Sequence, residues 1–254
     1  MSNTDLDLSG RTVLVTGAGR NIGRACALEF ARAGANVVVN ARSNAEEAGA
    51  VVDEARALGA QAVMALGDVG VPGDVDGIVA VANDAFGSVD AYVSCAAVRR
   101  RQPLLEITDE DWNSTLSSNL SASFYLARRL VPGMVDKQWG RIMHISGHDG
   151  FRGSLNRAHN VAAKLGLHGL TKAMAKELGP HGITVNTVVA GSFNTTRKKS
   201  DYPNWSVEGR SKANPLGRIG DPSELAWLCL FLASPRSGYM TGQAFHINGG
   251  ENMY

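Results

Sequence analysis

The sequence predicts an α/β fold built on a single, doubly wound, seven-stranded parallel sheet with helices on both faces. Short apolar runs alternate with segments of helical spacing along the whole chain, and this alternation is typical of parallel sheets. The stretch Thr12–Arg42 alone contains a strand, a glycine-rich turn, a helix and a second strand. A hydrophobic fraction of 44% and 29 glycines also suit a buried sheet with many tight turns.

The opening unit begins with the apolar run Val13–Val15, which predicts a buried strand. Apolar residues at helical spacing then lead to Ala33 and Gly34, where the helix is expected to end, and Val37–Val39 predicts the next strand. The first N–H groups of such a helix can bind phosphate, and glycines let the backbone approach it closely. The unit therefore predicts nucleotide binding, with a purely structural turn as the alternative, at Gly17, Gly19 and Gly23.

The remaining chain continues the alternation. Apolar runs predict strands at Ala62–Leu66, Ala91–Ser94, Ile142–Ile145, Val185–Val189 and Ala244–Ile247. Segments with an apolar face, or rich in Ala and Leu, predict helices at Glu46–Leu58, Val75–Phe86, Asp109–Leu130, Ala158–Leu178 and Pro222–Ala233. The polar stretch Asn194–Ala213 is expected to be irregular. No linker or internal repeat divides the sequence, so we expect one domain spanning residues 1–254.

Composition and charge argue against several classes of function. The formal net charge of +1 gives no sign of nucleic-acid binding. No apolar run has the length of a membrane span, and Met1–Asp7 is polar rather than signal-like, so we expect a cytoplasmic protein. Three cysteines lie in apolar segments without the spacing of metal ligands, so we expect buried thiols and neither a disulfide nor a metal site, at Cys26, Cys95 and Cys229.

A set of motifs extends through the chain. Thr16–Gly23 reads TGAGRNIG, and other informative positions follow at Asp68-Val69, Asn119, Lys164, Asn186, Gly191, Thr195, Pro215–Arg218, Thr241–Gln243 and Asn248–Gly250. As a set, they resemble the short-chain dehydrogenase/reductase family from about Leu8 to Gly250. The resemblance implies a Rossmann-like fold, a nicotinamide cofactor and hydride transfer on a small-molecule substrate. It also implies a homotetramer, which in this family commonly forms through the helices expected at Asp109–Leu130 and Ala158–Leu178.

The cofactor can be narrowed to NADP(H). An acidic residue at the end of the second strand would bind the ribose 2′-hydroxyl of NAD, but the sequence has Ala41 there, followed by Arg42. Arginine presents a planar fork that suits phosphate, and Arg20 in the glycine turn is a second candidate. By resemblance, Asp68 contacts the adenine, Thr195 the nicotinamide amide and Lys164 the nicotinamide ribose. The predicted cofactor residues are Gly17, Gly19, Arg20, Asn21, Ile22, Gly23, Arg42, Asp68, Val69, Lys164 and Thr195.

The active site departs from the family pattern. Counting back from Lys164, the position of the family's catalytic tyrosine holds Asn160, and the position of its serine holds Gly147. An asparagine can orient a substrate oxygen but does not titrate usefully near neutral pH. His148 and Asp149 follow the vacant serine position and are candidate proton donors, whereas His159 and His144 are expected to be structural. The predicted catalytic residues are Asn119, Asn160, Lys164, His148 and Asp149, with no metal ligand.

Three functions are therefore open. The first is an NADP(H)-dependent oxidoreductase that acts on a carbonyl or alcohol with a non-standard proton donor. The second is a reductase of a conjugated C=C bond, because the dienoyl-thioester reductases of the superfamily also lack the tyrosine. The third is a catalytically silent NADP(H)-binding sensor or partner subunit. In each case we expect the substrate loop at about residues 193–213, with possible aromatic contacts from Phe193, Tyr202 and Trp205.

Overall fold

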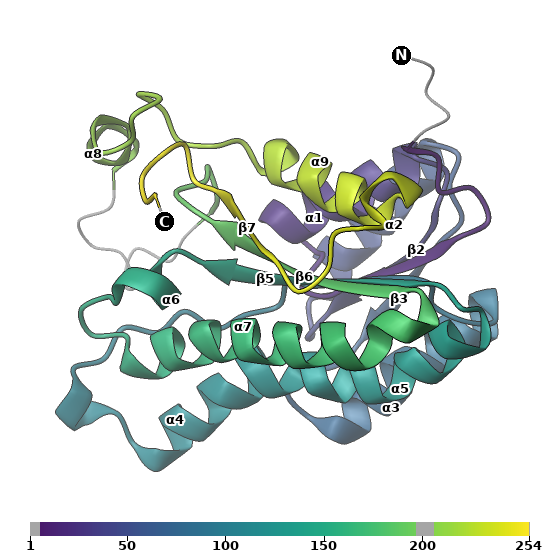
Figure 1. Ribbon diagram of the computed structural model, residues 1–254, viewed down its shortest axis with the longest axis horizontal. Helices are drawn as coiled ribbons and strands as arrows, with labels where there is room; N and C mark the ends of the chain where they lie inside the picture. The colour runs from purple at the N-terminus through teal and green to yellow at the C-terminus, as the bar shows by residue number, and fades with distance from the viewer. Residues whose placement is uncertain (1–5, 197–205, 254) are drawn as a thin grey trace.

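The computed structural model describes residues 6–196 and 206–253. Its centre is one seven-stranded sheet with the strand order β3-β2-β1-β4-β5-β6-β7 (Figure 1), in which every neighbouring pair is parallel. The predicted fold class is thus confirmed, with strands at β1 Thr12–Val15, β2 Asn36–Ala41, β3 Ala62–Leu66, β4 Ala91–Ser94, β5 Gly140–Gly147, β6 Ile183–Ala190 and β7 Ala244–Ile247.

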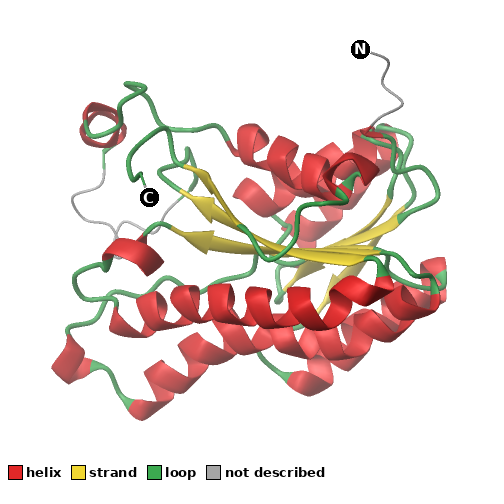
Figure 2. Cartoon of the chain, in the orientation of Figure 1, coloured by secondary structure: helices red, strands yellow, loops and turns green. Residues whose placement is uncertain are grey.

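Helices cover both faces of the sheet (Figure 2). One layer contains α1 (Asn21–Arg32), α2 (Ala45–Ala57) and α9 (Pro222–Ala233), and the other contains α3 (Pro72–Phe86), α4 (Asp109–Leu116), α5 (Ala122–Asp136) and α7 (Ala158–Leu178). Alternate residues of one strand enter opposite cores: Val13 and Val15 pack in the first, and Leu14 in the second. Burial on both faces explains why the strands are continuous apolar runs.

The sheet reverses its direction of growth between β1 and β4. The chain runs outward from β1 through β2 to β3 and then returns to add β4 on the other side of β1. The loops after β1 and β4 therefore separate and leave a crevice between them. Thr16 joins the two loops, because its hydroxyl oxygen accepts hydrogen bonds from Cys95 N (2.9 Å) and Ala96 N (3.0 Å).

The predicted continuous helix Asp109–Leu130 is wrong in detail. The structure has α4 and α5 joined by a π-helical turn, Ser117–Ser121, and α5 continues to Asp136. Asn119 lies in this turn and makes two hydrogen bonds of 2.8 Å with the backbone of Val98, donating through Nδ2 and accepting through Oδ1. π-turns are frequent at functional sites, and here the turn brings a helix side chain to the loop after β4.

The segment Asn194–Ala213, predicted to be irregular, contains the short helix α8 (Val207–Lys212). Ser206 begins it, since its hydroxyl oxygen accepts a hydrogen bond from Gly209 N at 3.0 Å. A second short helix, α6 (Asp149–Arg152), was also missed. Both are too short to show helical periodicity in the sequence. Tyr202 and Trp205 lie outside the described residues.

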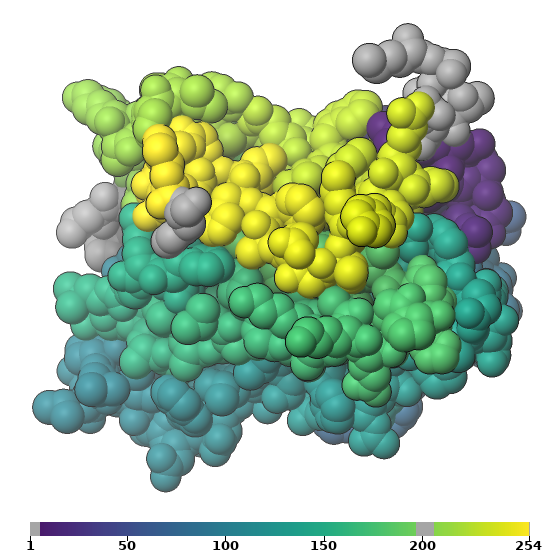
Figure 3. Space-filling model, viewed as in Figure 1, coloured from purple at the N-terminus to yellow at the C-terminus, as the bar shows by residue number. Residues whose placement is uncertain are grey.

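The C-terminal residues, yellow in Figure 3, cover the edge of the sheet between the two helical layers. They follow β7 and bring Glu251 back to the loop after β6, where its carboxylate accepts a hydrogen bond of 3.0 Å from the Ser192 hydroxyl. Among the helices that the structure describes, none is long and apolar enough to cross a membrane.

Candidate functional site

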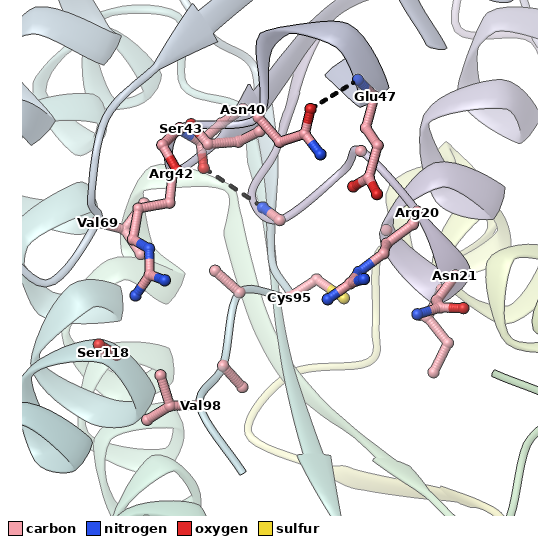
Figure 4. Close-up of a pocket in the computed structure, with 18 of the residues that line it drawn as sticks. Arg20, Asn21, Asn40, Arg42, Ser43, Glu47, Val69, Cys95, Val98 and Ser118 are labelled. Atoms are coloured by element: carbon pink, nitrogen blue, oxygen red, sulfur yellow. Dashed lines mark hydrogen bonds between the residues drawn. The ribbon is translucent and has the colours of Figure 1, made fainter. Parts of the chain in front are cut away.

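A cleft of about 530 Å³ opens beyond the carboxyl ends of the strands, as the topology predicts. Loops after β1, β2, β3, β4 and β6 line it (Figure 4). Ten of the predicted cofactor residues lie along this cofactor cleft, and Lys164 lies in an adjoining pocket. The ten are Gly17, Gly19, Arg20, Asn21, Ile22, Gly23, Arg42, Asp68, Val69 and Thr195.

The glycine turn packs closely on its surroundings. Gly17 has φ +61°, and a Cβ there would lie 2.9 Å from Ala96 Cα, while a Cβ on Gly23 would lie 2.3 Å from the Gly17 carbonyl oxygen. Helix α1 then starts with no side-chain cap and no acidic residue in its first turn. Its first N–H groups and partial positive charge therefore face the cleft without an internal anion, which fits the pyrophosphate of a dinucleotide.

The end of the cleft near β2 carries positive charge. Ala41 is the last residue of β2, and Arg42 follows with a side chain that is 69% exposed, its Nη1 4.0 Å from Asp68 Oδ2. Figure 4 shows Arg42 and Arg20 extending into the cleft from opposite sides. Glu47, which was not predicted from the sequence, lines the same cleft and adds a carboxylate to it.

Asn40 was also missed, although a polar residue inside the apolar run of β2 was the signal for it. Its side chain is buried, accepts a hydrogen bond from Gly17 N at 3.3 Å and donates to the carbonyl oxygens of Ala65 at 3.0 Å and Gly67 at 3.2 Å. Asn40 therefore fixes the glycine turn against the ends of the neighbouring strands. We regard it as a positioning residue, because its hydrogen bonds reach backbone atoms of the turn.

Asn21 connects the glycine turn to the segment after β6. It adopts φ +54°, a left-handed conformation that asparagine tolerates better than most residues. Its Oδ1 accepts hydrogen bonds from the backbone N of Thr196 at 2.9 Å and from the Thr196 hydroxyl at 2.8 Å. The neighbouring Thr195 hydroxyl is buried and has no hydrogen-bond partner among the described residues. An unpaired buried hydroxyl at this place fits a ligand amide.

A second pocket, of about 120 Å³, adjoins the cofactor cleft and is called the substrate pocket below. Predicted catalytic residues Asn160, Lys164, His148 and Asp149 line it, whereas Asn119 lines neither this pocket nor the cofactor cleft. Asn160 Nδ2 donates a hydrogen bond of 3.0 Å to the carbonyl oxygen of Val98, the same oxygen that Asn119 binds. The two asparagines therefore hold the loop after β4 in place.

Lys164 lies on α7, one helical turn after Asn160, and is only 9% exposed. Its Nζ donates a hydrogen bond of 2.7 Å to the carbonyl oxygen of Ile145 at the end of β5. Burial lowers the pKa of Lys164 to about 8, and the positive charge of Arg99 contributes in the same direction. The ammonium group is therefore mostly protonated at pH 7, yet it releases its proton more readily than an ordinary lysine.

His148 and Asp149 belong to a cluster of charges at the mouth of the substrate pocket. Burial lowers the pKa of His148, so its neutral form is favoured at pH 7. The Asp149 carboxylate accepts hydrogen bonds from Arg152 (3.2 Å) and from Arg157 (3.3 Å). The buried Glu251 carboxylate lies 3.5 Å from Arg210 Nη1 and 3.8 Å from Arg152 Nη1. Neither these arginines nor Glu251 was predicted as a site residue from the sequence.

Three further polar residues near the two pockets can be placed. Ser146 lines the pocket, but its hydroxyl donates to the Lys164 carbonyl oxygen at 3.1 Å. His144 is buried and lies 2.8 Å from the Thr171 hydroxyl, as expected of a structural residue. His159 is also buried and lines neither pocket. Within residues 6–196 and 206–253, no group of three metal-ligating side chains comes together.

Comparisons with known proteins agree with this geometry. A family model described as enoyl-(acyl carrier protein) reductase matches residues 17–252. The 3-oxoacyl-[acyl-carrier-protein] reductase FabG of Vibrio cholerae is 36% identical over 98% of this chain and 100% of its own length. The (2S)-[(R)-hydroxy(phenyl)methyl]succinyl-CoA dehydrogenase subunit BbsD of Thauera aromatica is 34% identical over 98% and 99% of the two chains.

Solved structures of dehydrogenases are also similar to this chain. A protein from Sinorhizobium meliloti, described as a short-chain alcohol dehydrogenase, superimposes with a TM-score of 0.91 at 30% identity over 97% of this chain and 98% of that one. The match extends over both helical layers and the whole sheet, including the segments that build the cleft. The chain therefore belongs to the short-chain dehydrogenase/reductase family and is an oxidoreductase of this type.

Proposed function

We propose that this oxidoreductase uses NADP(H) and transfers hydride to or from a carbonyl or alcohol substrate. The observation that carries the proposal is the pair Arg20 and Arg42 at the end of the cofactor cleft, together with Ala41 where NAD-binding proteins have an acid. The relatives that are 3-oxoacyl-[acyl-carrier-protein] reductases support carbonyl reduction. When bound, the cofactor supplies or accepts the hydride.

The side chains of the substrate pocket provide the remaining parts of the reaction. Asn160 uses one amide N–H on the Val98 carbonyl oxygen, and its second N–H is available to orient the substrate oxygen. A hydride added to a carbonyl carbon leaves negative charge on the oxygen, which requires a proton. We propose Lys164 as the donor of this proton, because its ammonium group is buried in the pocket and its pKa is lowered to about 8.

His148 and Asp149, the donors favoured by sequence reasoning, are less suitable for reduction. A neutral imidazole is a poor proton donor, and the acceptor nitrogen of His148, Nε2, already accepts a hydrogen bond of 3.1 Å from Arg152 Nη2. The Asp149 oxygens are both bound by arginines. We therefore assign Asp149 to holding the pocket wall. His148 stays a candidate base for the reverse direction only if Nε2 is released from Arg152.

Two alternatives each have one supporting observation. The matching family model is described as enoyl-(acyl carrier protein) reductase, and this favours reduction of a conjugated C=C bond as the second candidate. The relative BbsD is named as a subunit of a dehydrogenase, and this supports the third candidate, an NADP(H)-binding partner subunit without turnover. The absence of the family tyrosine at Asn160 is compatible with both.

Several further expectations complete the proposal. We propose one dinucleotide-binding domain over residues 1–254, with the substrate loop at about residues 193–213.

We also propose a homotetramer, because Phe124 on α5 and Leu165 on α7 are 44% and 49% exposed on the helices that form subunit contacts in the family. Light scattering at micromolar concentration tests the assembly, and a monomer would contradict it. The cytoplasmic location stays a prediction.

The decisive experiment combines binding with turnover. Calorimetric titration with NADPH and NADH comes first, followed by a spectrophotometric screen of ketones and enoyl thioesters with the cofactor that binds more tightly. Tight NADPH binding with ketone reduction supports the proposal. Turnover of enoyl thioesters alone would favour the second candidate, and tight binding without any turnover would favour the third.

A further inference from the structure

The wall of the substrate pocket is unusually rich in arginine. Among the lining residues that the structure describes, five are arginines, and they come from three separate parts of the chain. Asp149 is the only carboxylate among the lining residues that the structure describes, and Glu251 lies behind the wall. With Lys164 also mostly protonated at pH 7, positive charge exceeds negative charge among these described lining residues. The five are Arg99, Arg101, Arg152, Arg157 and Arg210.

The two carboxylates do not neutralise this charge. Asp149 is shared between Arg152 and Arg157, and Glu251 is shared between Arg152 and Arg210. Three arginines therefore surround two carboxylates. Arg152 takes part in both groups, yet its side chain is still 37% exposed and lines the pocket.

Arg99 adds a charge without an internal partner. It makes no hydrogen bond or ion pair with any residue that the structure describes. Arg99, Lys164 and Cys95 all line the substrate pocket, and the charge of Arg99 lowers the pKa of both other side chains. The adjacent Arg100 is held differently, because it forms an ion pair with Asp111 on α4.

A buried nitrogen in the same pocket also lacks a partner. The side chain of His148 is 10% exposed, and its Nδ1 makes no hydrogen bond within the described part of the chain. The nearest charged oxygen, Glu251 Oε2, is 3.6 Å away. Arg152 Nη2 donates a hydrogen bond of 3.1 Å to Nε2 of the same ring, so Nδ1 carries the ring proton. Buried polar atoms are normally paired, and this unpaired donor beside the arginines is compatible with a ligand that has acceptor oxygens.

We infer that the substrate carries a carboxylate or phosphate group that binds among Arg99, Arg152 and Arg210 in the substrate pocket. Guanidinium groups bind both anions through charge-assisted hydrogen bonds, and a pocket partly shielded from water strengthens that interaction. This inference rests on the proposed function in one respect, because it places the anion on the carbonyl substrate of that reaction. Neutral ketones of the same size are then expected to bind poorly.

Matched pairs of ketones test this inference without requiring turnover. The protein is saturated with NADP⁺, so that a ketone cannot be reduced, and is titrated calorimetrically with 3-oxobutanoate against methyl 3-oxobutanoate. Dihydroxyacetone phosphate against dihydroxyacetone forms the second pair and separates phosphate from carboxylate. We expect at least one anion to bind roughly tenfold or more tightly than its neutral partner, with affinity decreasing as salt is added.

Two arginine variants test where the anionic group binds. Arg152→Gln should weaken the anion roughly tenfold and leave the neutral ketone unchanged, and Asp149 and Glu251 still keep one arginine each. Arg210→Gln is a second variant, in case the first one fails to fold. Arg32→Gln removes an arginine that is 53% exposed on α1 and lines neither pocket, so it serves as the charge-matched control.

The outcomes separate this inference from the proposed function. Equal affinity for acid and ester in both pairs, or no binding of either anion, overturns the inference. The inference is also overturned if neither Arg152→Gln nor Arg210→Gln changes the affinity for the anion. Failure of NADP⁺ itself to bind contradicts the proposed cofactor instead, and the anion titration is then made on the cofactor-free protein with the same criteria.

Discussion

Replacing Arg42 by alanine tests the assignment of the cofactor. The guanidinium of Arg42 is 69% exposed and has only a long contact of 4.0 Å with Asp68, so its removal should cost the free protein little stability. A charge-assisted hydrogen bond contributes about 1.5–3 kcal/mol. Solvent exposure reduces this to about 1–1.5 kcal/mol, which corresponds to an increase of about five- to thirteen-fold in the Kd of NADPH.

The same substitution should leave NADH binding nearly unchanged, because NADH has no 2′-phosphate. The assay is calorimetric titration of each variant with both cofactors. Adding Arg20→Ala to Arg42→Ala should weaken NADPH binding by a further factor of similar size. Arg24→Ala is the control, because it removes an arginine whose exposed ion pair is with Glu54 on α2. An equal loss of NADPH and NADH affinity on Arg42→Ala would refute the assignment of the 2′-phosphate site.

Three further predictions concern the proton donor, the turn and acid stability. Lys164→Met should abolish the decline in kcat/KM for reduction that we expect above about pH 8, the pKa of Lys164; an unchanged pH profile would exclude it as donor. Asn21→Gly removes the bonds to Thr196 and should raise the dissociation rate of NADPH several-fold in stopped-flow experiments; an unchanged rate would mean that this contact does not control release. Burial lowers the pKa of His144 to about 3, so the unfolded state binds more protons between pH 6.5 and 3, and stability falls as pH decreases, by about 2 kcal/mol at pH 5. His144→Gln should flatten that decline in chemical denaturation, and an unaltered slope would contradict this cause.

Much of the fold was predictable because the spacing of apolar residues along the sequence indicates the strands and helices. The strands β1 and β2 are buried on both faces, so Val13–Val15 and Val37–Val39 are unbroken apolar runs. The π-turn at Asn119 was not predictable, since it depends on hydrogen bonds to Val98, which is distant in sequence. Helix α8 was missed because six residues give no periodic signal.

The site residues that lie on a single loop were predictable from the sequence. Those that several distant segments bring together were missed. The glycine turn and Arg42 follow directly from their position after predicted strands. Glu251 is placed by β7 and the turn after it, so its contact with Arg210 appears only in three dimensions. The sequence shows many arginines around residues 99–157, but their convergence on one pocket depends on how β4, β5 and α7 meet.

Hydride transfer itself is the central claim, and deuterium labelling tests it most directly. The protein is incubated with NADPH deuterated at the transferring C4 position and with the ketones described above, and the products are analysed by mass spectrometry. The account predicts an alcohol that carries one deuterium on the former carbonyl carbon, with a strongly reduced signal on Lys164→Met. NADPH that binds tightly but transfers no deuterium to any of these ketones would contradict carbonyl reduction by this site.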